Sequence, residues 1–445
     1  MSFTRYPEYR ESQVDWLGEI PAAWDVAKFR HIFRESGEKI DDEVVGPMLS
    51  VSGYRGIEIK DYEDDNQRRS DEDLVGYRIV RPGQLVVNTM WLNYAGLGVS
   101  EHEGHVSPAY RSYWIEADVD SRYIHHLMRS SLYVQGYTQL LTGIRPNSLQ
   151  MSRDNLMGFP VLLPPLEDQQ AIAAFLDRET AKIDALVAEQ ERLIALLKEK
   201  RQAVISHAVT KGLDPDAPMK DSGIEWLGEI PAHWEVRTLK SLVERGVSIS
   251  YGIVQPGENV EDGVPFIQTT NMSSGNFDLS ILQRTTADIA SAYPRSTLRP
   301  DDVVLGIRAS IGAAHIVPEE LAGANLSRGV ARIQCGEEIY PQYLVACLGS
   351  ASTERYWQLC KQGSTFNEVS IETVKNLKIA VPPKNEQEKI IQQCQVEQER
   401  FADILAAATD LLAVMRERRA ALISAAVTGK IDVRGLAKQH EMEAA

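Results

Sequence analysis

The stretch LEDQQAIAAFLDRETAKIDALVAEQERLIALLKEKRQAVISHAVT, residues 166–210, decides the fold of this chain. Read at alternating steps of four and three residues, it places apolar side chains on one seam with polar interruptions. Pro164 and Pro165 precede the stretch, and Gly212 follows it as a stop signal. About 45 helical residues make a rod of about 70 Å, which is not stable alone in water. The stretch therefore predicts a long helix that pairs with another helix.

The partner helix is expected in the same chain, because the seam recurs 218 residues later. Its flanks recur as well: Pro382 and Pro383 precede it, and the ending AVISHAVTKG becomes ALISAAVTGK. Two unrelated helices would not share a constant offset together with matching flanks. The residues expected to pair the two helices are Ile172, Leu176, Ile183, Leu186, Leu193, Leu197, Val204, Ile390, Phe401, Ile404, Leu411, Met415 and Leu422.

A second repeat is built around tryptophan. The box DWLGEIPAAW, residues 15–24, returns as EWLGEIPAHW, residues 225–234, with eight of ten positions identical. Each box combines an apolar anchor with a glycine turn and a proline that restricts the preceding isoleucine to extended geometry. We interpret the box as a loop whose tryptophan fastens a domain to its neighbour, in preference to a direct chemical role.

The order box, globular segment and long helix occurs twice, which indicates a duplication of large units. Each globular segment mixes short β-type runs with one helical pattern, at residues 123–141 and 343–359. The turns Arg81-Pro82-Gly83 and Arg299-Pro300-Asp301 match at the offset of 218, whereas the residues between framework positions share almost nothing.

These repeats predict the α+β fold class, with two globular α/β domains and two long antiparallel helices that form an intramolecular coiled coil. A pseudo-two-fold axis would relate the halves of a dumbbell. The expected domains are an arm and box at 1–24, a globular domain at 25–165, a long helix at 166–212, a linker and box at 213–234, a globular domain at 235–383, a long helix at 384–430 and a polar tail at 431–445.

Composition indicates an ordinary globular protein, with 43% hydrophobic and 25% charged residues. A formal charge of −16 argues against nonspecific nucleic-acid binding by the whole surface, although local basic faces remain possible. The chain has no apolar run of membrane-span length and no signal-peptide core at its start, so a cytoplasmic location is expected. Its four cysteines form no CxxC pair and are interpreted as free thiols in a reducing compartment.

Catalytic and metal motifs are missing from the sequence. Neither proline pair follows Asn or Asp and precedes an aromatic residue, as a base-flipping amino-methyltransferase would require. There is no G-x-x-x-x-G-K-[ST] phosphate loop. His102 and His105 flank Glu103, but no second ligand cluster lies at workable spacing, so no metal site is expected. We interpret His125 and His126 as one face of an amphipathic helix.

The WLGEIP boxes, the RPG turn, the Gly-x-x-x-Asn turn at 143–147, the helix starts LPPLEDQ and VPPKNEQE and the endings AVTKG and AVTGK occur in a duplicated order. In this respect the chain resembles the specificity subunit of a type I restriction–modification enzyme, over residues 15–430. The resemblance implies two target-recognition domains, each of which reads one half of a bipartite double-stranded DNA site. The helices would space these domains and dock two methyltransferase subunits.

The resemblance also implies that this chain is not catalytic. Adenine methylation and ATP-dependent cleavage would belong to methyltransferase and restriction/translocase subunits. No cofactor is expected on this chain, because S-adenosylmethionine, ATP and Mg²⁺ would bind those partners. No membrane partner is implied.

Sequence-specific reading of DNA needs Arg, Asn or Gln on base edges and further donors on phosphates. Side chains of these types lie in the unlike loops of both globular segments, as two different half-sites would require. The candidates are Tyr54, Arg55, Gln67, Arg68, Arg69, Asn88, Asn93, Tyr110, Arg111, Arg145, Asn147, Ser250, Tyr251, Gln255, Gln268, Thr269, Thr270, Asn271, Arg308, Asn325, Arg328, Ser364 and Thr365.

Three alternatives stay open at this point. One globular segment could hold an unrecognised hydrolytic site, which would make the chain an enzyme. The chain could be a coiled-coil scaffold whose globular domains bind protein. It could also be the specificity subunit of another multi-subunit methyltransferase or restriction system.

Overall fold

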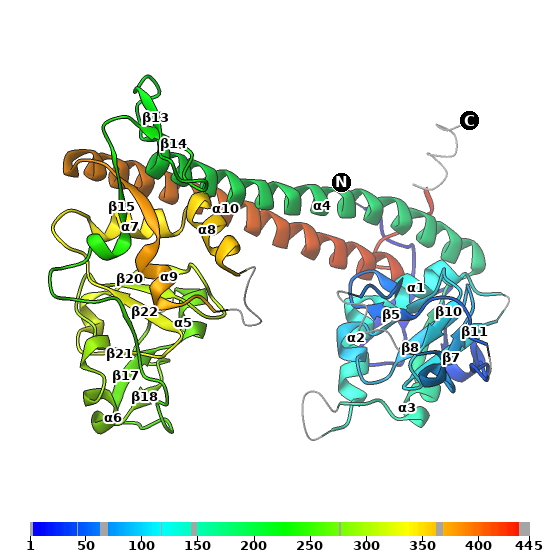
Figure 1. The fold of residues 1–445 in the computed structure, drawn as a ribbon. Coiled ribbons are helices and arrows are strands. Elements are labelled where there is room, and N and C mark those ends of the chain that lie inside the picture. Colours follow the sequence, from blue (N-terminus) through cyan, green and yellow to red (C-terminus); the bar gives the residue numbers. More distant parts are fainter. Residues whose placement is uncertain are drawn as a thin grey trace. The chain divides into compact units, whose positions relative to one another are not determined.

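The computed structural model describes residues 3–41, 43–62, 70–116, 118–143, 149–275, 277–361 and 368–435. The chain forms two compact units (Figure 1). Unit 1 comprises Met1–Glu191 and Asp410–Ala445, and unit 2 comprises Arg192–Thr409. The helices α4 (Leu166–Lys211) and α10 (Lys384–Val427) are the long elements predicted from the repeated seam, and each contributes to both units.

Unit 1 contains a series of short strands followed by three short helices. Its elements before α4 are β1 (Tyr9–Glu11), β2 (Glu19–Pro21), β3 (Asp25–Lys28), β4 (Phe33–Glu35), β5 (Leu49–Ser52), β6 (Gly56–Ile59), β7 (Arg78–Val80), β8 (Leu85–Asn88), β9 (Leu97–Val99), β10 (Gly104–Val106), β11 (Tyr110–Ile115), α1 (Ser121–Arg129), α2 (Ser131–Leu140), α3 (Arg153–Gly158) and β12 (Pro160–Leu163).

Unit 2 has a similar plan with extra short helices. Its elements between α4 and α10 are β13 (Met219–Asp221), β14 (Glu229–Pro231), β15 (Glu235–Thr238), β16 (Ser250–Tyr251), β17 (Val264–Ile267), α5 (Thr269–Ser274), β18 (Arg284–Thr285), α6 (Ala287–Ser291), β19 (Val303–Gly306), β20 (Ala314–Ile316), β21 (Asn325–Leu326), β22 (Val330–Ile333), α7 (Pro341–Leu348), α8 (Ala351–Lys361), α9 (Ile371–Asn376) and β23 (Lys378–Val381).

The duplicated sequence folds into a duplicated topology. The antiparallel four-stranded sheet has the order β4-β11-β8-β9 in unit 1 and β16-β22-β19-β20 in unit 2. The pairs β1-β2 and β12-β3 of unit 1 correspond to β13-β14 and β15-β23 of unit 2. The units differ where the sequences differ. Unit 1 has the two-stranded sheets β5-β6 and β10-β7, whereas unit 2 has the three-stranded sheet β18-β17-β21.

The box tryptophans fasten each globular part to a long helix, as the sequence predicts. Trp24 and Trp234 are fully buried. The Trp24 indole donates a hydrogen bond of 3.3 Å to Asp168, and the Trp234 indole donates one of 2.9 Å to Glu386. Both carboxylates lie in the first turn of a long helix, where the helix dipole favours negative charge.

The two predicted helical patterns each break into two helices. In unit 1 the break is at Ser130, whose backbone is extended and whose hydroxyl accepts a hydrogen bond from the Tyr133 amide. In unit 2 it follows Gly349, where the Ser350 hydroxyl accepts from the Thr353 amide. Serine in this position satisfies an otherwise unpaired N–H group and starts a new helix.

The long helices pack antiparallel within each unit. In unit 1 Asp184 pairs with Arg419 and Glu191 pairs with Arg416, so residue numbers rise along one helix as they fall along the other. In unit 2 the side chains of α4 and α10 share one apolar core, to which Ile205 and Ile390 belong.

Burial along the predicted pairing seam is uneven. Leu186, Leu193, Ile404 and Leu411 are exposed by 40–56%. A helix of 3.6 residues per turn drifts past a strict 3.5-residue seam, so neighbouring positions turn inward. The buried seam residues are Ile172, Leu176, Val187, Ile390, Phe401, Ala408 and Leu412, while Ile183, Leu197, Val204, Met415 and Leu422 are half-buried. Among the described residues, no helix is long and apolar enough to span a bilayer.

A buried ion pair between β22 and the start of β19 gives a test of the packing inside unit 2. Arg332 Nε lies 2.6 Å from Asp302 Oδ2, and both side chains are buried. Arg332→Met leaves the buried carboxylate without its charged partner, so the free energy of unfolding should fall by about 3 kcal/mol. Arg237→Met, which breaks a more exposed pair with Glu338, should change it by less than about 1 kcal/mol. Urea denaturation measures both variants, and a neutral Arg332→Met would contradict the prediction.

Candidate nucleic-acid interface

The same backbone hydrogen bond occurs at one end of the four-stranded sheet in both units. In unit 1 the Met151 amide donates a 3.1 Å hydrogen bond to the Thr89 carbonyl, just after β8. In unit 2 the Val369 amide donates a 2.9 Å bond to the Ile307 carbonyl, just after β19. The contact joins the turn after a central sheet strand to the end of the polar loop that precedes α3 or α9. Both of these loops were predicted from the sequence to contact DNA.

In unit 2 this end of the sheet brings three predicted residues together. Tyr251, Arg308 and Arg328 line one cavity of about 370 Å³. Tyr251 is 50% exposed, and Arg328 is exposed. Arg308 pairs with Glu368, and its Nε is buried without a hydrogen-bond partner among the described residues. Guanidinium groups and aromatic rings are the kinds of side chain that contact phosphates and base edges and stack on bases.

The backbone next to Tyr251 packs closely against the Leu326 backbone at Gly252. A Cβ atom at this position would lie 1.9 Å from the Leu326 carbonyl oxygen, so only glycine fits. The Ile253 amide donates to that same oxygen over 2.6 Å, and the Arg328 amide donates to the Ile253 carbonyl over 2.8 Å. The segments that carry Tyr251 and Arg328 are therefore joined by backbone hydrogen bonds.

In unit 1 the equivalent turn presents apolar and aromatic side chains. Met90, Trp91 and Tyr94 are 40%, 55% and 61% exposed, and the two aromatic rings lie 6.0 Å apart. These three residues were not among those predicted to contact DNA, although the Trp-Leu-Asn-Tyr run soon after a strand was a usable signal. Exposed aromatic rings at a loop edge can stack on bases or wedge between them.

Three residues that were predicted to contact DNA form hydrogen bonds within their own unit. The Tyr54 hydroxyl donates a 2.6 Å hydrogen bond to Asp184, and the Arg419 guanidinium lies 4.5 Å from the Tyr54 ring centroid. Burial, and next the hydrogen bond to Asp184, raises the pKa of Tyr54 to about 12. Asn88 is buried and accepts from the Met90 amide.

Asn325 is also buried, and its side chain bonds Ala290 and Leu326. A buried, satisfied side chain cannot reach a base edge without breaking its own contacts. Tyr54, Asn88 and Asn325 therefore serve the fold of their own unit.

The other described candidates are distributed around the two units. Arg55 is exposed and pairs with Glu58. Arg111 is bonded to nearby carbonyls and to Glu35. Gln268 and Asn271 form a capping box at the start of α5, whereas Gln255 and Thr270 are exposed. Asn93, Tyr110, Ser250 and Thr269 are half-buried. Gln67, Arg68, Arg69, Arg145, Asn147, Ser364 and Thr365 lie outside the described residues.

The histidines of α1 form a structural cluster. His126 Nε2 lies 2.7 Å from Asp177, and His125 Nδ1 accepts from the Val99 amide over 3.3 Å. His125 packs against Gly56, where an added Cβ would lie 2.7 Å from the ring. Within the part of the chain that the structure describes, His, Cys, Asp and Glu form no group of three suited to a metal ion.

The half-buried His125 predicts a pH dependence of stability. Burial, followed by the charge of Arg129, lowers its pKa to about 3, against about 6.5 in an unfolded chain. A base with a lowered pKa stabilises the fold above pH 6.5 and loses that contribution as the pH falls toward 3, by roughly 1.4 kcal/mol per pH unit. His125→Gln keeps an acceptor for Val99, so between pH 7 and 4.5 it should lose about 2–3 kcal/mol less stability than the parent. Urea titrations that give identical pH slopes would contradict this.

The fold places the chain in a known structural class. A chain from a structure that concerns assembly and conformational transition of the type I restriction–modification system matches it with a TM-score of 0.67 and 16% identity. That match covers 93% of this chain and 99% of the other.

Sequence comparisons agree with this class. Residues 231–420 match the family model of the type I restriction modification DNA specificity domain. The EcoBI specificity subunit of a type I restriction enzyme from Escherichia coli is 28% identical over 62% of this chain, and the match spans 58% of that relative's length. A relative from Methanocaldococcus jannaschii, assigned as the MjaX specificity subunit, is 22% identical over 98% of this chain and 99% of its own. Residues 231–420 thus match the DNA specificity domain of type I restriction–modification enzymes, and the chain is similar to their specificity subunits.

Proposed function

We propose that this chain selects the DNA target of a type I restriction–modification complex, with each unit reading one half of a bipartite site. The observation that carries the proposal is a shared framework with unlike surfaces. The same end of the same sheet carries Trp91 and Tyr94 in unit 1 but Tyr251, Arg308 and Arg328 in unit 2. Two domains of the same fold that recognise different DNA sequences require a shared framework with different surface side chains.

The long helices offer a surface for partner subunits. In unit 1 they expose Leu186, Leu411 and Val414. In unit 2 they expose Leu193, Leu196, Val396 and Ile404. Apolar groups of this size, repeated along a helix, are typical of a protein-binding surface. Because each unit carries such a surface, two methyltransferase subunits dock, and the helices space the two readers.

Chemistry belongs to the partners in this proposal. The methyltransferase subunits bind S-adenosylmethionine and modify adenine, and restriction subunits use ATP and Mg²⁺ to cleave. This chain contributes the choice of sequence. Its formal charge of −16 is consistent with DNA contact through local basic groups within an assembled complex.

Exchange of one globular part tests the division of labour. Residues 25–163 would be replaced by the corresponding segment of a related subunit, and the complex would be expressed in cells. One half of the methylated site should change while the other half stays the same. Sequencing of methylated sites provides the readout, and a simultaneous change in both halves would refute independent reading.

Arg328 provides a residue-level test in the assembled methyltransferase complex. Arg328 is exposed and lines the same cavity as Tyr251, so Arg328→Ala should weaken binding of the complex to its target DNA about tenfold, as for loss of one base or phosphate contact. Arg245→Ala removes an exposed arginine outside this cavity and should change affinity less than twofold. Equilibrium binding at a fixed salt concentration measures both, and equal effects would argue against this cavity as the DNA surface.

A further inference from the structure

Arg308 of unit 2 is joined to a carboxylate through both its backbone and its side chain. The backbones of Arg308 and Glu368 form an isolated antiparallel bridge, and Arg308 Nη2 donates a hydrogen bond to Glu368 Oε2. The neighbouring Val369 amide extends the contact by donating to the Ile307 carbonyl over 2.9 Å. The two side chains are 31% and 37% exposed, so this doubly fastened pair lies at the surface of unit 2.

The rest of the Arg308 side chain is confined as well. A Cβ atom at Gly329 would lie 3.5 Å from Arg308 Cβ and 3.8 Å from Arg308 Cδ, so the aliphatic stem packs along this glycine. Arg308 Nε is buried and has no hydrogen-bond partner among the described residues. Because Nη2 is bound to Glu368, the unbonded Nη1 and the second hydrogen of Nη2 remain for an external acceptor.

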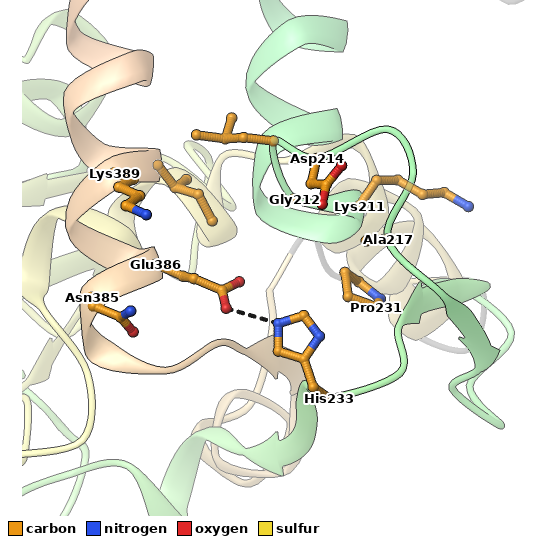
Figure 2. Close-up of a pocket in the computed structure, with 11 residues that line it drawn as sticks. Lys211, Gly212, Asp214, Ala217, Pro231, His233, Asn385, Glu386 and Lys389 are labelled. Atoms are coloured by element: carbon orange, nitrogen blue, oxygen red, sulfur yellow. Dashed lines mark hydrogen bonds and ion pairs between the residues drawn. The ribbon is translucent and has the colours of Figure 1, made fainter.

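Glu386 shows what a carboxylate with an evident role in the fold of unit 2 looks like. Figure 2 shows His233 directed at Glu386, with 2.8 Å between their side chains. Glu386 also accepts a hydrogen bond from the buried Trp234 indole. The Glu368 carboxylate is bonded to Arg308 alone among the described residues, and a partly exposed pair of this kind contributes little to stability. The stability of the fold therefore does not account for Glu368.

General affinity for DNA does not account for Glu368 either. Of the described residues that line the cavity with Arg308 and Arg328, Glu368 is the only acidic one. A carboxylate in this place repels the phosphates of every DNA sequence. A mobile arginine would gain affinity by reaching phosphates, but phosphate contacts carry no sequence information. A fastened guanidinium loses that affinity and keeps its donors in one direction, which base-edge contacts need.

We infer that Glu368 is a positioning residue that makes Arg308 selective for a base edge in the half-site of unit 2. This role rests on the proposed function and deepens it, because it assigns sequence discrimination to a side chain that does not itself have to touch DNA. By binding Nη2, Glu368 keeps the guanidinium from turning toward a phosphate. The base that fits the remaining donors is guanine, whose O6 and N7 accept two parallel hydrogen bonds from an arginine.

Discrimination by the assembled methyltransferase complex tests this role. The target duplex is identified by sequencing of methylated sites, and the half-site of unit 2 is the half that exchange of residues 25–163 leaves unchanged. The Kd for this target is compared, at fixed salt, with the Kd for duplexes that carry one altered base pair in that half. Glu368→Ala should lower discrimination at one G·C pair at least about fivefold, the lower end of what one bidentate contact provides.

The same variant should bind unrelated DNA more tightly than the parent does. The freed guanidinium then reaches a phosphate, so the plot of log Kd against log salt concentration should steepen by about one unit. A purely structural role for Glu368 would weaken binding to target and unrelated DNA alike, without this steeper salt dependence.

Two control variants separate positioning from charge. Glu368→Gln keeps an acceptor for Nη2 and should keep discrimination within about twofold of the parent. Glu261→Ala removes an exposed carboxylate outside the cavity and should leave discrimination unchanged. Discrimination in the half-site of unit 1 should be the same in all variants. Equal losses in both half-sites, or equal losses for Glu368→Gln and Glu368→Ala, would overturn the inference.

Arg308→Ala separates this role from the proposed function. If Arg308→Ala lowers discrimination at the same base pair and Glu368→Ala does not, the cavity reads DNA without help from Glu368, and only the positioning role is refuted. If neither variant changes discrimination, the cavity does not read DNA, and the proposed DNA surface of unit 2 is refuted together with the positioning role.

Discussion

The hydrogen bond from a buried indole to a carboxylate in the first helical turn organises each unit. Trp24 and Asp168 form it in unit 1, and Trp234 and Glu386 form it in unit 2. A buried carboxylate is costly unless its oxygens are bonded, and a buried indole N–H needs an acceptor. Each group therefore satisfies the other, and together they fix where the long helix begins relative to the box.

A buried tyrosine extends this anchor to the other long helix. The Tyr123 hydroxyl donates to the Leu162 and Val427 carbonyls, and the Tyr343 hydroxyl donates to the Ala380 and Val209 carbonyls. One phenol thus reaches both a strand that leads into one long helix and the last turns of the other. Burial raises the pKa of Tyr343 far above its usual value, so the phenol stays protonated and available as a donor. The surfaces at the far end of the sheet can vary because this anchor does not depend on them.

Local pattern was enough to predict the long helices and the duplication. The seam, the prolines before it and the glycine after it give α4 within one residue of its observed end at Lys211. The phase of the seam was less accurate, because Leu186 and Val187 are both apolar and only packing decides which one turns inward. The break at Ser130 left a capping serine in the sequence, but the helical pattern on both sides concealed it.

A single sequence does not indicate which residues far apart in the chain will contact one another. Tyr54 meets Asp184 and Arg419, which lie 130 and 365 positions away, and nothing near Tyr54 in the chain indicates them. Asn88 and Asn325 had the right chemistry for base reading, but their burial follows from the sheet around them. The exposed aromatic turn at Trp91 was detectable in principle. Its side chains are apolar and aromatic, whereas the residue types that read base edges are polar.

The hydrogen bond between Thr4 and Asp432 has a consequence for how the chain is threaded. Backbone near one terminus meets backbone near the other within unit 1, while the linker at 213–218 is largely exposed. If a short peptide joined residues near Thr4 and Asp432, and the chain were opened within that linker, every strand pairing described here would survive. A chain permuted in this way should therefore keep the same strand pairings with the repeats in the opposite order.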